Sequence, residues 1–344
     1  AVTRARQSWA LINLLEGYHM DLFESLAQKI TGKDQTIVFP EGTEPRIVGA
    51  AARLAADGLV KPIVLGATDK VQAVANDLNA DLTGVQVLDP ATYPAEDKQA
   101  MLDALVERRK GKNTPEQAAK MLEDENYFGT MLVYMGKADG MVSGAIHPTG
   151  DTVRPALQII KTKPGSHRIS GAFIMQKGEE RYVFADCAIN IDPDADTLAE
   201  IATQSAATAK VFDIDPKVAM LSFSTKGSAK GEMVTKVQEA TAKAQAAEPE
   251  LAIDGELQFD AAFVEKVGLQ KAPGSKVAGH ANVFVFPELQ SGNIGYKIAQ
   301  RFGHFEAVGP VLQGLNKPVS DLSRGCSEED VYKVAIITAA QGLA

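Results

Sequence analysis

The sequence is poor in cysteine and has none of the long apolar runs that span membranes. Its 344 residues contain two cysteines, Cys187 and Cys326, which lie far apart and form neither a CxxC motif nor a disulfide framework. A reducing compartment is therefore expected, and we predict a cytoplasmic protein. No apolar run approaches the roughly 18 residues that a membrane-spanning helix needs, and no signal peptide is evident.

Several common ligand-binding motifs are also missing. No GxGxxG opens a helix after a strand, no GxxxxGK[ST] occurs, and neither HExxH nor a paired Cys/His spacing is present. The sequence thus gives no sign of a nicotinamide site of the usual kind, a P-loop or a zinc site. We predict no metal and no tightly bound cofactor. The formal charge of −9 argues against non-specific nucleic-acid binding, and no nucleic-acid or membrane partner is expected.

What the sequence does contain is typical of a globular protein with two domains. Apolar residues make up 45 % and charged residues 23 % of the chain. Residues 1–19 fit poorly with the rest, because His19-Met20 resembles a cloning junction and Met20 a natural start. We interpret residues 1–19 as a leader outside the fold. The alternative is an amphipathic N-terminal helix.

Short β-rich runs alternate with helical patterns along the rest of the chain. The expected strands begin the segments 36–45, 61–66, 85–90, 140–152, 217–231 and 282–293. The expected helices are 46–58, 98–111, 115–125, 195–212 and 232–247. This alternation predicts an α/β protein with βαβ units and parallel pairing. In such sheets ligands bind beyond the carboxyl ends of the strands, so the glycine-bearing loops are candidate sites.

The segment DLSRGCSEED (321–330) has the pattern of a helix start. Ser327 and Asp330 have the spacing of a capping box, with aspartate in place of the usual glutamate. The acidic residues 328–330 suit the positive end of a helix dipole. This interpretation gives the segment a purely structural role.

The same segment has features that capping does not need. Ser323 and Arg324 precede the helix, and Gly325 permits a tight turn. A hydroxyl, a guanidinium and free N–H groups at a helix N-terminus suit a phosphate or an oxyanion, and Asp330 could take a proton there. An acyl-cysteine at Cys326 is a further alternative, which no histidine nearby in sequence supports. The structural and functional interpretations both stay open.

A second polar segment, VSGAIHPTGDTVRPALQII (142–160), is expected to follow a strand. It offers Ser143, Gly144 and Thr152, and Arg154-Pro155 is expected to begin a helix with proline at an early position. The alternative is a βα loop capped by Thr152, with Arg154 on the surface.

Three further segments could hold phosphates. ERRKGK (107–112) has four basic residues in six, which predicts either a solvated helix end or a phosphate clamp. SFSTKGSAKGE (222–232) and LQSGNIGYKIAQR (289–301), which contains Asn293, suit phosphate or dimer contacts. The alternative for both is a solvated loop and helix face.

Together these segments resemble the phosphate acetyltransferase family over essentially residues 20–344. The motifs that carry the resemblance are SGAIHPTGDTVRPALQI, AMLSFSTKGSAKGE, DGELQFDAA, APGSKVAGHANVFVFPELQSGNIGYKIAQR and PVSDLSRGCSEED. The resemblance implies two α/β domains with a cleft between them, as in the isocitrate and isopropylmalate dehydrogenases, usually in a homodimer. We expect one domain of residues 20–155 plus 317–344 and a second of residues 156–316, which is expected to carry the dimer contact.

The resemblance also implies an activity, reversible acetyl transfer between acetyl phosphate and coenzyme A. It assigns catalytic roles to Ser323, Arg324 and Asp330, with Asp330 as the base. The expected substrate-binding residues are Arg154, Arg108, Ser143, Gly144, Thr152 and Asn293. We expect direct thiolate attack in a ternary complex. A phosphate butyryltransferase and a non-enzymatic acetyl-CoA-sensing domain are the alternatives, and the presence of all three catalytic side chains disfavours the second. Arg46 also matches a family arginine, with no role assigned.

Overall fold

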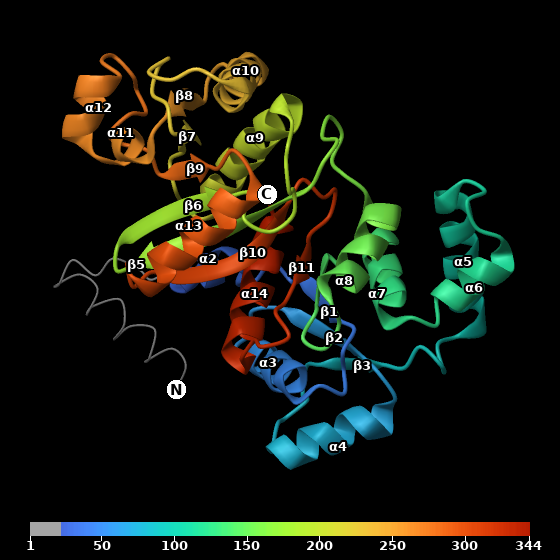
Figure 1. Ribbon diagram of the computed structural model, residues 1–344. Coiled ribbons are helices and arrows are strands. Elements are labelled where there is room, and N and C mark those ends of the chain that lie inside the picture. Colours follow the sequence, from blue (N-terminus) through green and yellow to red (C-terminus); the bar gives the residue numbers. More distant parts are fainter. Residues whose placement is uncertain (1–21) are drawn as a thin grey trace.

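The computed structural model describes residues 22–344, whose strands form two sheets (Figure 1). The first sheet has five strands in the order β11-β4-β1-β2-β3, all paired parallel. They are β1 (Thr36–Phe39), β2 (Lys61–Leu65), β3 (Gln86–Leu88), β4 (Gly140–Ser143) and β11 (Val319–Asp321). The interpretation of residues 1–19 as a leader falls outside the described residues.

The second sheet has six strands in the order β10-β5-β6-β9-β7-β8. They are β5 (Ser170–Lys177), β6 (Glu180–Ala185), β7 (Lys217–Leu221), β8 (Ala252–Leu257), β9 (Val283–Val285) and β10 (Glu306–Gln313). Parallel pairing is confirmed for the first sheet and for β6, β7, β8 and β9, whereas β5 pairs antiparallel with both β6 and β10. The sequence does contain a pattern that indicates the β5–β6 hairpin. Gly178, which has φ +58°, lies between two apolar runs, as is typical of a hairpin turn.

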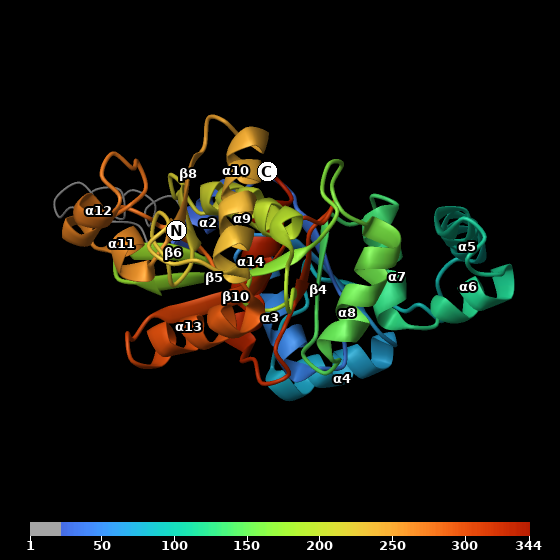
Figure 2. The same ribbon diagram turned by 45° about the horizontal axis from the view of Figure 1, so that its top comes forward.

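Helices pack around both sheets (Figure 1). With the first sheet lie α2 (Leu22–Ile30), α3 (Pro45–Ala56), α4 (Thr68–Leu78), α5 (Ala95–Arg109), α6 (Pro115–Met121), α7 (Glu125–Tyr134), α8 (Thr149–Pro155), the π-helical segment η1 (Ala156–Ile160) and α14 (Glu328–Gln341). With the second lie α9 (Ala195–Val211), α10 (Glu232–Ala247), α11 (Phe259–Phe263), α12 (Glu265–Lys271) and α13 (Leu289–Arg301). Figure 2 shows α5 and α6 at the end of the molecule farthest from the second sheet. None of the helices within residues 22–344 has the length and apolarity that crossing a membrane requires.

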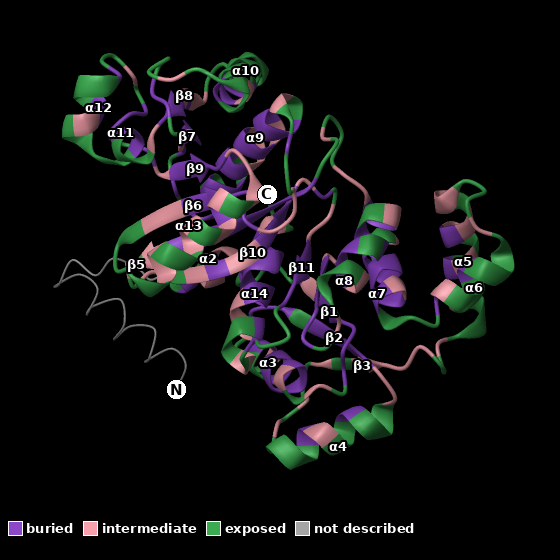
Figure 3. Ribbon diagram, viewed as in Figure 1, coloured by how far each residue is buried: buried purple, intermediate pink, exposed green. Residues whose placement is uncertain are grey.

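The two sheets share a buried seam between α14 and β10. Val308 and Val311 of β10 belong to the same buried cluster as Val334 and Ile337 of α14. Burial of each such side chain contributes about 1.5–3 kcal/mol, so this seam joins the two halves strongly. Figure 3 shows the buried residues running through the strands and along the inner side of α14.

The chain crosses between the sheets twice, and the two crossings lie side by side. It leaves the first sheet after η1 and returns after β10. Thr162 and Leu315 form an antiparallel bridge between the crossings, and the Lys163 N–H donates to the Gly314 carbonyl at 2.9 Å. β11 and α14 therefore complete the first sheet after the second sheet has been built.

Candidate active site

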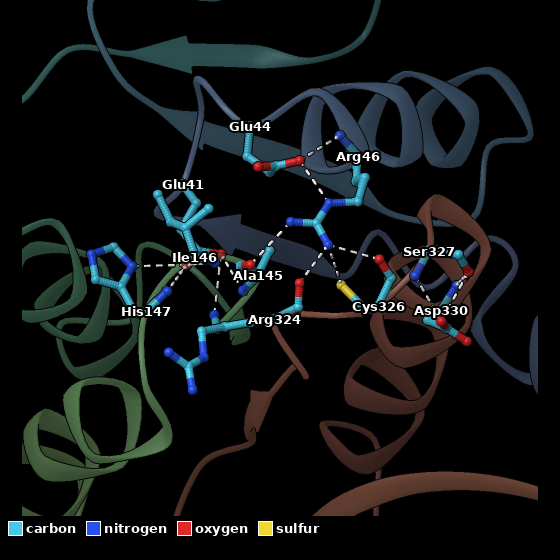
Figure 4. Close-up of polar contacts among 11 residues, drawn as sticks. Glu41, Glu44, Arg46, Ala145, Ile146, His147, Arg324, Cys326, Ser327 and Asp330 are labelled. Atoms are coloured by element: carbon cyan, nitrogen blue, oxygen red, sulfur yellow. Dashed lines mark hydrogen bonds and ion pairs between the residues drawn. The ribbon is translucent and has the colours of Figure 1, made fainter.

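Three loops meet at the carboxyl end of the first sheet (Figure 4). They follow β1, β4 and β11 and comprise residues 40–44, 144–148 and 322–327. The Leu322 N–H donates to the Ser143 carbonyl at 2.7 Å, which joins the second loop to the third. The two polar segments that the sequence singled out as candidate sites therefore lie against each other.

The start of α14 is the predicted capping box. Ser327 Oγ accepts from the Asp330 N–H at 3.1 Å, and Asp330 Oδ2 accepts from the Ser327 N–H at 2.8 Å. The Ser327 hydroxyl also donates to Asp330 Oδ2 at 2.9 Å. The predicted capping box is therefore confirmed, and it uses only one carboxylate oxygen of Asp330, which is exposed.

Ser323 and Asp330 line one cavity of about 300 Å³ between the two sheets. Its wall on the side of the second sheet comes from β10 and the end of α13. Ser323 Oγ accepts a hydrogen bond from the Gly325 N–H at 3.2 Å. The hydroxyl proton of this exposed serine remains available to a ligand in the cavity.

Arg324 is exposed beside this cavity, and its guanidinium is free. Within residues 22–344 no hydrogen bond or ion pair engages that guanidinium. Its backbone carbonyl accepts from Arg46 Nη1 at 2.9 Å. Figure 4 shows the side chain extending away from Arg46. The three groups predicted to act together, those of Ser323, Arg324 and Asp330, thus lie on one short loop and the helix start that follows it.

Arg46 ties the three loops together, a role the sequence did not reveal. Its Nη1 donates to the carbonyl oxygens of Arg324 at 2.9 Å and Cys326 at 2.7 Å. Its Nη2 donates to the carbonyl of Ala145 at 3.0 Å, and its Nε donates to Glu44 at 2.7 Å. A single guanidinium thus fixes the backbone on both sides of Gly325, within the turn Ser323–Cys326 (Figure 4).

The buried carboxylate of Glu41 organises the loop after β4. It accepts from the backbone N–H groups of Gly144, Ala145, Ile146 and His147 at 2.8–3.1 Å. It also lies 2.8 Å from His147 Nδ1. The backbone N–H groups that could bind an anion are therefore already occupied by the protein's own carboxylate. Within residues 22–344, His, Cys, Asp and Glu side chains nowhere gather in threes that could hold a metal ion.

Asp321, at the end of β11, is a second buried carboxylate. Its Oδ2 accepts from the Thr149 hydroxyl at 2.7 Å, which ties α8 to β11. Burial raises the pKa of Asp321 to about 6, although its hydroxyl partners oppose the shift. Gly144, with φ +109°, leaves room for this carboxylate, because a Cβ there would lie 2.5 Å from Asp321 Oδ1.

The helix after β4 begins earlier than the sequence indicated. α8 starts at Thr149 with Pro148 as its N-cap, so Arg154 lies in the last turn rather than the first. Thr152 is buried inside α8 and does not cap it, which makes the capping alternative wrong as well. Arg154 is on the surface, with Nη1 3.5 Å from an oxygen of Asp151. Pro155 cannot donate a backbone hydrogen bond, and the chain changes to π-helical winding directly after it.

Three other predicted substrate-binding residues use their polar groups within the protein. The hydroxyl of Ser143, which is fully buried, donates to Asn126 at 2.6 Å. The N–H of Gly144 is used by Glu41. The side-chain amide of Asn293 donates to the Cys187 carbonyl at 3.1 Å, and its oxygen accepts from Lys297 at 2.8 Å. Their positions support loops and helices rather than an open binding surface.

Arg108 belongs to a separate basic hollow. A cavity of about 260 Å³ is lined by Arg108, Arg109, Lys110, Lys112, Leu157, Gln158 and Lys161. Arg108 donates to the carbonyls of Ile159 at 2.6 Å and Ile160 at 3.1 Å, and its guanidinium lies 5.0 Å from the centre of the Tyr134 ring. Burial and then the neighbouring cations lower the pKa of Lys161. The hollow is suited to an anionic group.

Cys326 is a buried thiol that also lines the cavity shared by Ser323 and Asp330. It is 7 % exposed, and burial raises its pKa, although the nearby Arg46 acts in the opposite direction. Arg46 Nη1 lies 3.6 Å from its sulfur. Burial and the raised pKa both disfavour the thiolate that a nucleophilic cysteine needs.

Comparison with known proteins agrees with this geometry. Residues 21–339 match the family described as phosphate acetyl/butaryl transferase. The phosphate acetyltransferase of Bacillus subtilis (strain 168) is 63 % identical over 323 residues, which cover 94 % of this chain and 99 % of that protein.

Solved structures lead to the same family. A phosphotransacetylase from Streptococcus pyogenes is 63 % identical with a TM-score of 0.91, and one from Staphylococcus aureus is 60 % identical with a TM-score of 0.90. Each comparison covers 94 % of this chain and 98 % of the other. A putative 4-hydroxythreonine-4-phosphate dehydrogenase from Salmonella typhimurium, 14 % identical with a TM-score of 0.53, shares the fold alone. The chain is therefore a member of the phosphate acetyltransferase family, and its two α/β units have the arrangement that this resemblance implied.

Proposed function

We propose that the protein catalyses reversible acetyl transfer between acetyl phosphate and coenzyme A. The thiolate of coenzyme A attacks the carbonyl carbon of acetyl phosphate, and the bond from that carbon to the phosphate oxygen breaks. The products are acetyl-CoA and inorganic phosphate. The observation that carries the proposal is the single cavity shared by Ser323 and Asp330, with the free guanidinium of Arg324 beside it.

Ser323 and Arg324 would stabilise charge during this step. The serine hydroxyl donates to the oxyanion of the tetrahedral intermediate, an interaction worth about 3–4 kcal/mol in other acyl transfers. Arg324 binds the phosphate, and the free guanidinium supports this role. Arg154 would add positive charge from the surface of α8, although Asp151 already lies beside it.

Asp330 would take the proton from the thiol of coenzyme A. A thiol with a pKa of about 8.5 is mostly protonated at neutral pH, so a base helps the attack. Asp330 Oδ2 is used by Ser327, and we assign the transfer to the other carboxylate oxygen. We propose a ternary complex without an acyl-enzyme, in agreement with the buried thiol of Cys326.

The basic hollow around Arg108 would bind the phosphates of coenzyme A. Arg108 itself is engaged by two backbone carbonyls, whereas the lysines around it contribute most of the accessible charge. We therefore assign Arg108 the role of shaping the hollow. Ser143, Gly144, Thr152 and Asn293 would act indirectly, through the loops and helices that they hold.

We further propose a homodimer in contact through the domain expected from the sequence at residues 156–316, with η1 (Ala156–Ile160) packed on the first sheet and thus on the other domain, residues 20–155 plus 317–344. α13 supports this assignment, because Ile294, Ile298 and Phe302 recur at helical spacing and are 55 %, 52 % and 83 % exposed. Size-exclusion chromatography with light scattering tests it. Ile298→Asp should give monomers, and an unchanged dimer would place the contact elsewhere.

One assay tests the proposed activity directly. Purified protein is mixed with coenzyme A and acetyl, propionyl or butyryl phosphate, and thioester formation is followed by absorbance. Acetyl phosphate should give the fastest turnover. Preference for butyryl phosphate would identify the family's other activity, and no thioester from any of the three would refute acyl transfer.

A further inference from the structure

The catalytic cavity has an apolar lining in addition to its polar groups. Val308, Leu322, Cys326 and Val334 all line it, and each is between 5 % and 7 % exposed. All four belong to the buried cluster that joins the two sheets. The edge of the interdomain core therefore forms part of the cavity wall.

Two of the three charged side chains that line the cavity are paired with each other. Lys333 of α14 and Glu306 of β10 form an ion pair at 2.7 Å, and both line the cavity. The apolar side chains of the lining form no ion pairs, and they offer an occupant packing contacts instead. An occupant that carries an apolar group next to polar atoms would therefore match the lining better than a wholly charged one.

The register of α14 brings the two kinds of lining together. Asp330, Lys333 and Val334 are spaced i, i+3 and i+4, so they share one face of the helix. Val331, the neighbour of Asp330, is also fully buried but does not line the cavity. The side chain of Val334 thus lies one helical turn beyond the carboxylate assigned as the base.

We propose that Val308, Leu322 and Val334 form the pocket for the acyl chain and that their bulk sets the longest acyl group transferred. This inference rests on the proposed acyl transfer, and it identifies the residues that select the length of the acyl group. The walls come from both halves of the molecule, since Val308 belongs to β10 and Val334 to α14.

The expected size of the effect follows from the burial of methylene groups. A butyryl group is two methylenes longer than an acetyl group. Each methylene that fits gains about 0.8 kcal/mol on burial, and one that does not fit must displace packed side chains. One methylene in an apolar pocket typically changes specificity by about 10–200-fold.

The test compares kcat/KM for butyryl and acetyl phosphate, with coenzyme A as acceptor. Val334→Ala should raise the butyryl-to-acetyl ratio at least about tenfold, and Val334→Ile should lower it. Val308→Ala should raise the ratio from the opposite wall. Val331→Ala is the matched control, because it removes the same atoms from the same helix outside the cavity, and its ratio should equal that of the unaltered protein.

Two results would contradict the proposal that these side chains form the acyl-chain pocket. One is a ratio within about twofold of the unaltered protein for Val334→Ala and Val308→Ala alike. The other is an equal change in Val331→Ala, since loosening of the core would then explain it. If Val334→Ala does not fold, Val308→Ala and Val334→Ile decide the question. Absence of thioester from every acyl phosphate with the unaltered protein would instead refute the proposed function.

Discussion

The guanidinium of Arg46 donates to the carbonyl oxygen of Cys326 at 2.7 Å, although 280 positions separate the two residues in the sequence. The same side chain holds the carbonyls of Arg324 and Ala145. The position of the SRGC turn thus depends on a helix at the other end of the chain.

Replacement of Arg46 should therefore impair catalysis more than folding. Hydrogen bonds to charged groups contribute about 1.5–3 kcal/mol each, and Arg46→Ala removes several at once. We expect kcat/KM to fall by about a hundredfold or more, with Arg46→Lys little better because lysine lacks the planar fork. Arg53→Ala is the control, since Arg53 also joins α3 to α14 but through exposed ion pairs. An equal fall in kcat/KM in both variants would contradict the proposed role of Arg46 in holding the three loops together.

Asp330 and Ser327 allow capping to be separated from catalysis. Asp330→Asn keeps an oxygen that can accept from the Ser327 N–H, so we expect the fold to persist while kcat falls by at least about a hundredfold. Ser327→Ala removes the cap and should cost about 0.5–2 kcal/mol of stability with a smaller kinetic effect. Thermal unfolding and steady-state kinetics measure both. If Asp330→Asn melts early and keeps its turnover, Asp330 serves only as a cap.

Cys326→Ala should keep most of the activity. The thiol is buried, its pKa is raised by burial, and Ser323 rather than Cys326 offers the exposed hydrogen-bond donor. We expect kcat for acetyl phosphate within about threefold of the unaltered protein. An inactive Cys326→Ala that melts normally would show an acyl-cysteine instead, and mass spectrometry of the protein with acetyl phosphate alone would then detect the acetylated chain.

Asp321 should make the stability of the protein depend on pH. Burial raises the pKa of this carboxyl from 3.8 to about 6 in the folded state, so the folded protein binds the proton more tightly than the unfolded chain. The free energy of unfolding therefore falls as pH rises from about 4 to 6, by about 3 kcal/mol at most from this group. Urea denaturation of Asp321→Asn beside the unaltered protein measures the difference. As pH rises across that interval, the free energy of unfolding of Asp321→Asn should increase relative to that of the unaltered protein. A difference that stays constant with pH would contradict the raised pKa of Asp321.

Local patterns in the sequence predicted local structure well. The capping box of Ser327 and Asp330 needs only residues three apart, and the structure confirms it. The candidate loops after β4 and β11 lie at the carboxyl end of the first sheet, where ligands of parallel sheets bind, but the pairing of β11 with β4 could not be predicted from sequence. Glu41 and Arg46 could not be found in this way, because their partners lie 103 to 106 and 99 to 280 positions away.

The segment around Pro155 shows a different limit of sequence reasoning. Proline is favoured in the first turn of a helix, so the pattern predicts a start at Arg154-Pro155, whereas Pro148 precedes the helix and Pro155 ends it. Two prolines seven positions apart fit either choice. The tie between Thr149 and Asp321 selects the earlier start, and no single-segment pattern contains that information.

The late return of the chain to the first sheet has a consequence for biosynthesis. During translation residues 170–313 leave the ribosome before β11 does. The edge of β4 that pairs with β11 therefore stays unpaired while the second sheet and its helices fold. Ser323, Arg324 and Asp330 follow β11 in the sequence and so emerge later still. A partly synthesised molecule can therefore be largely folded and still lack the three side chains proposed for acyl transfer.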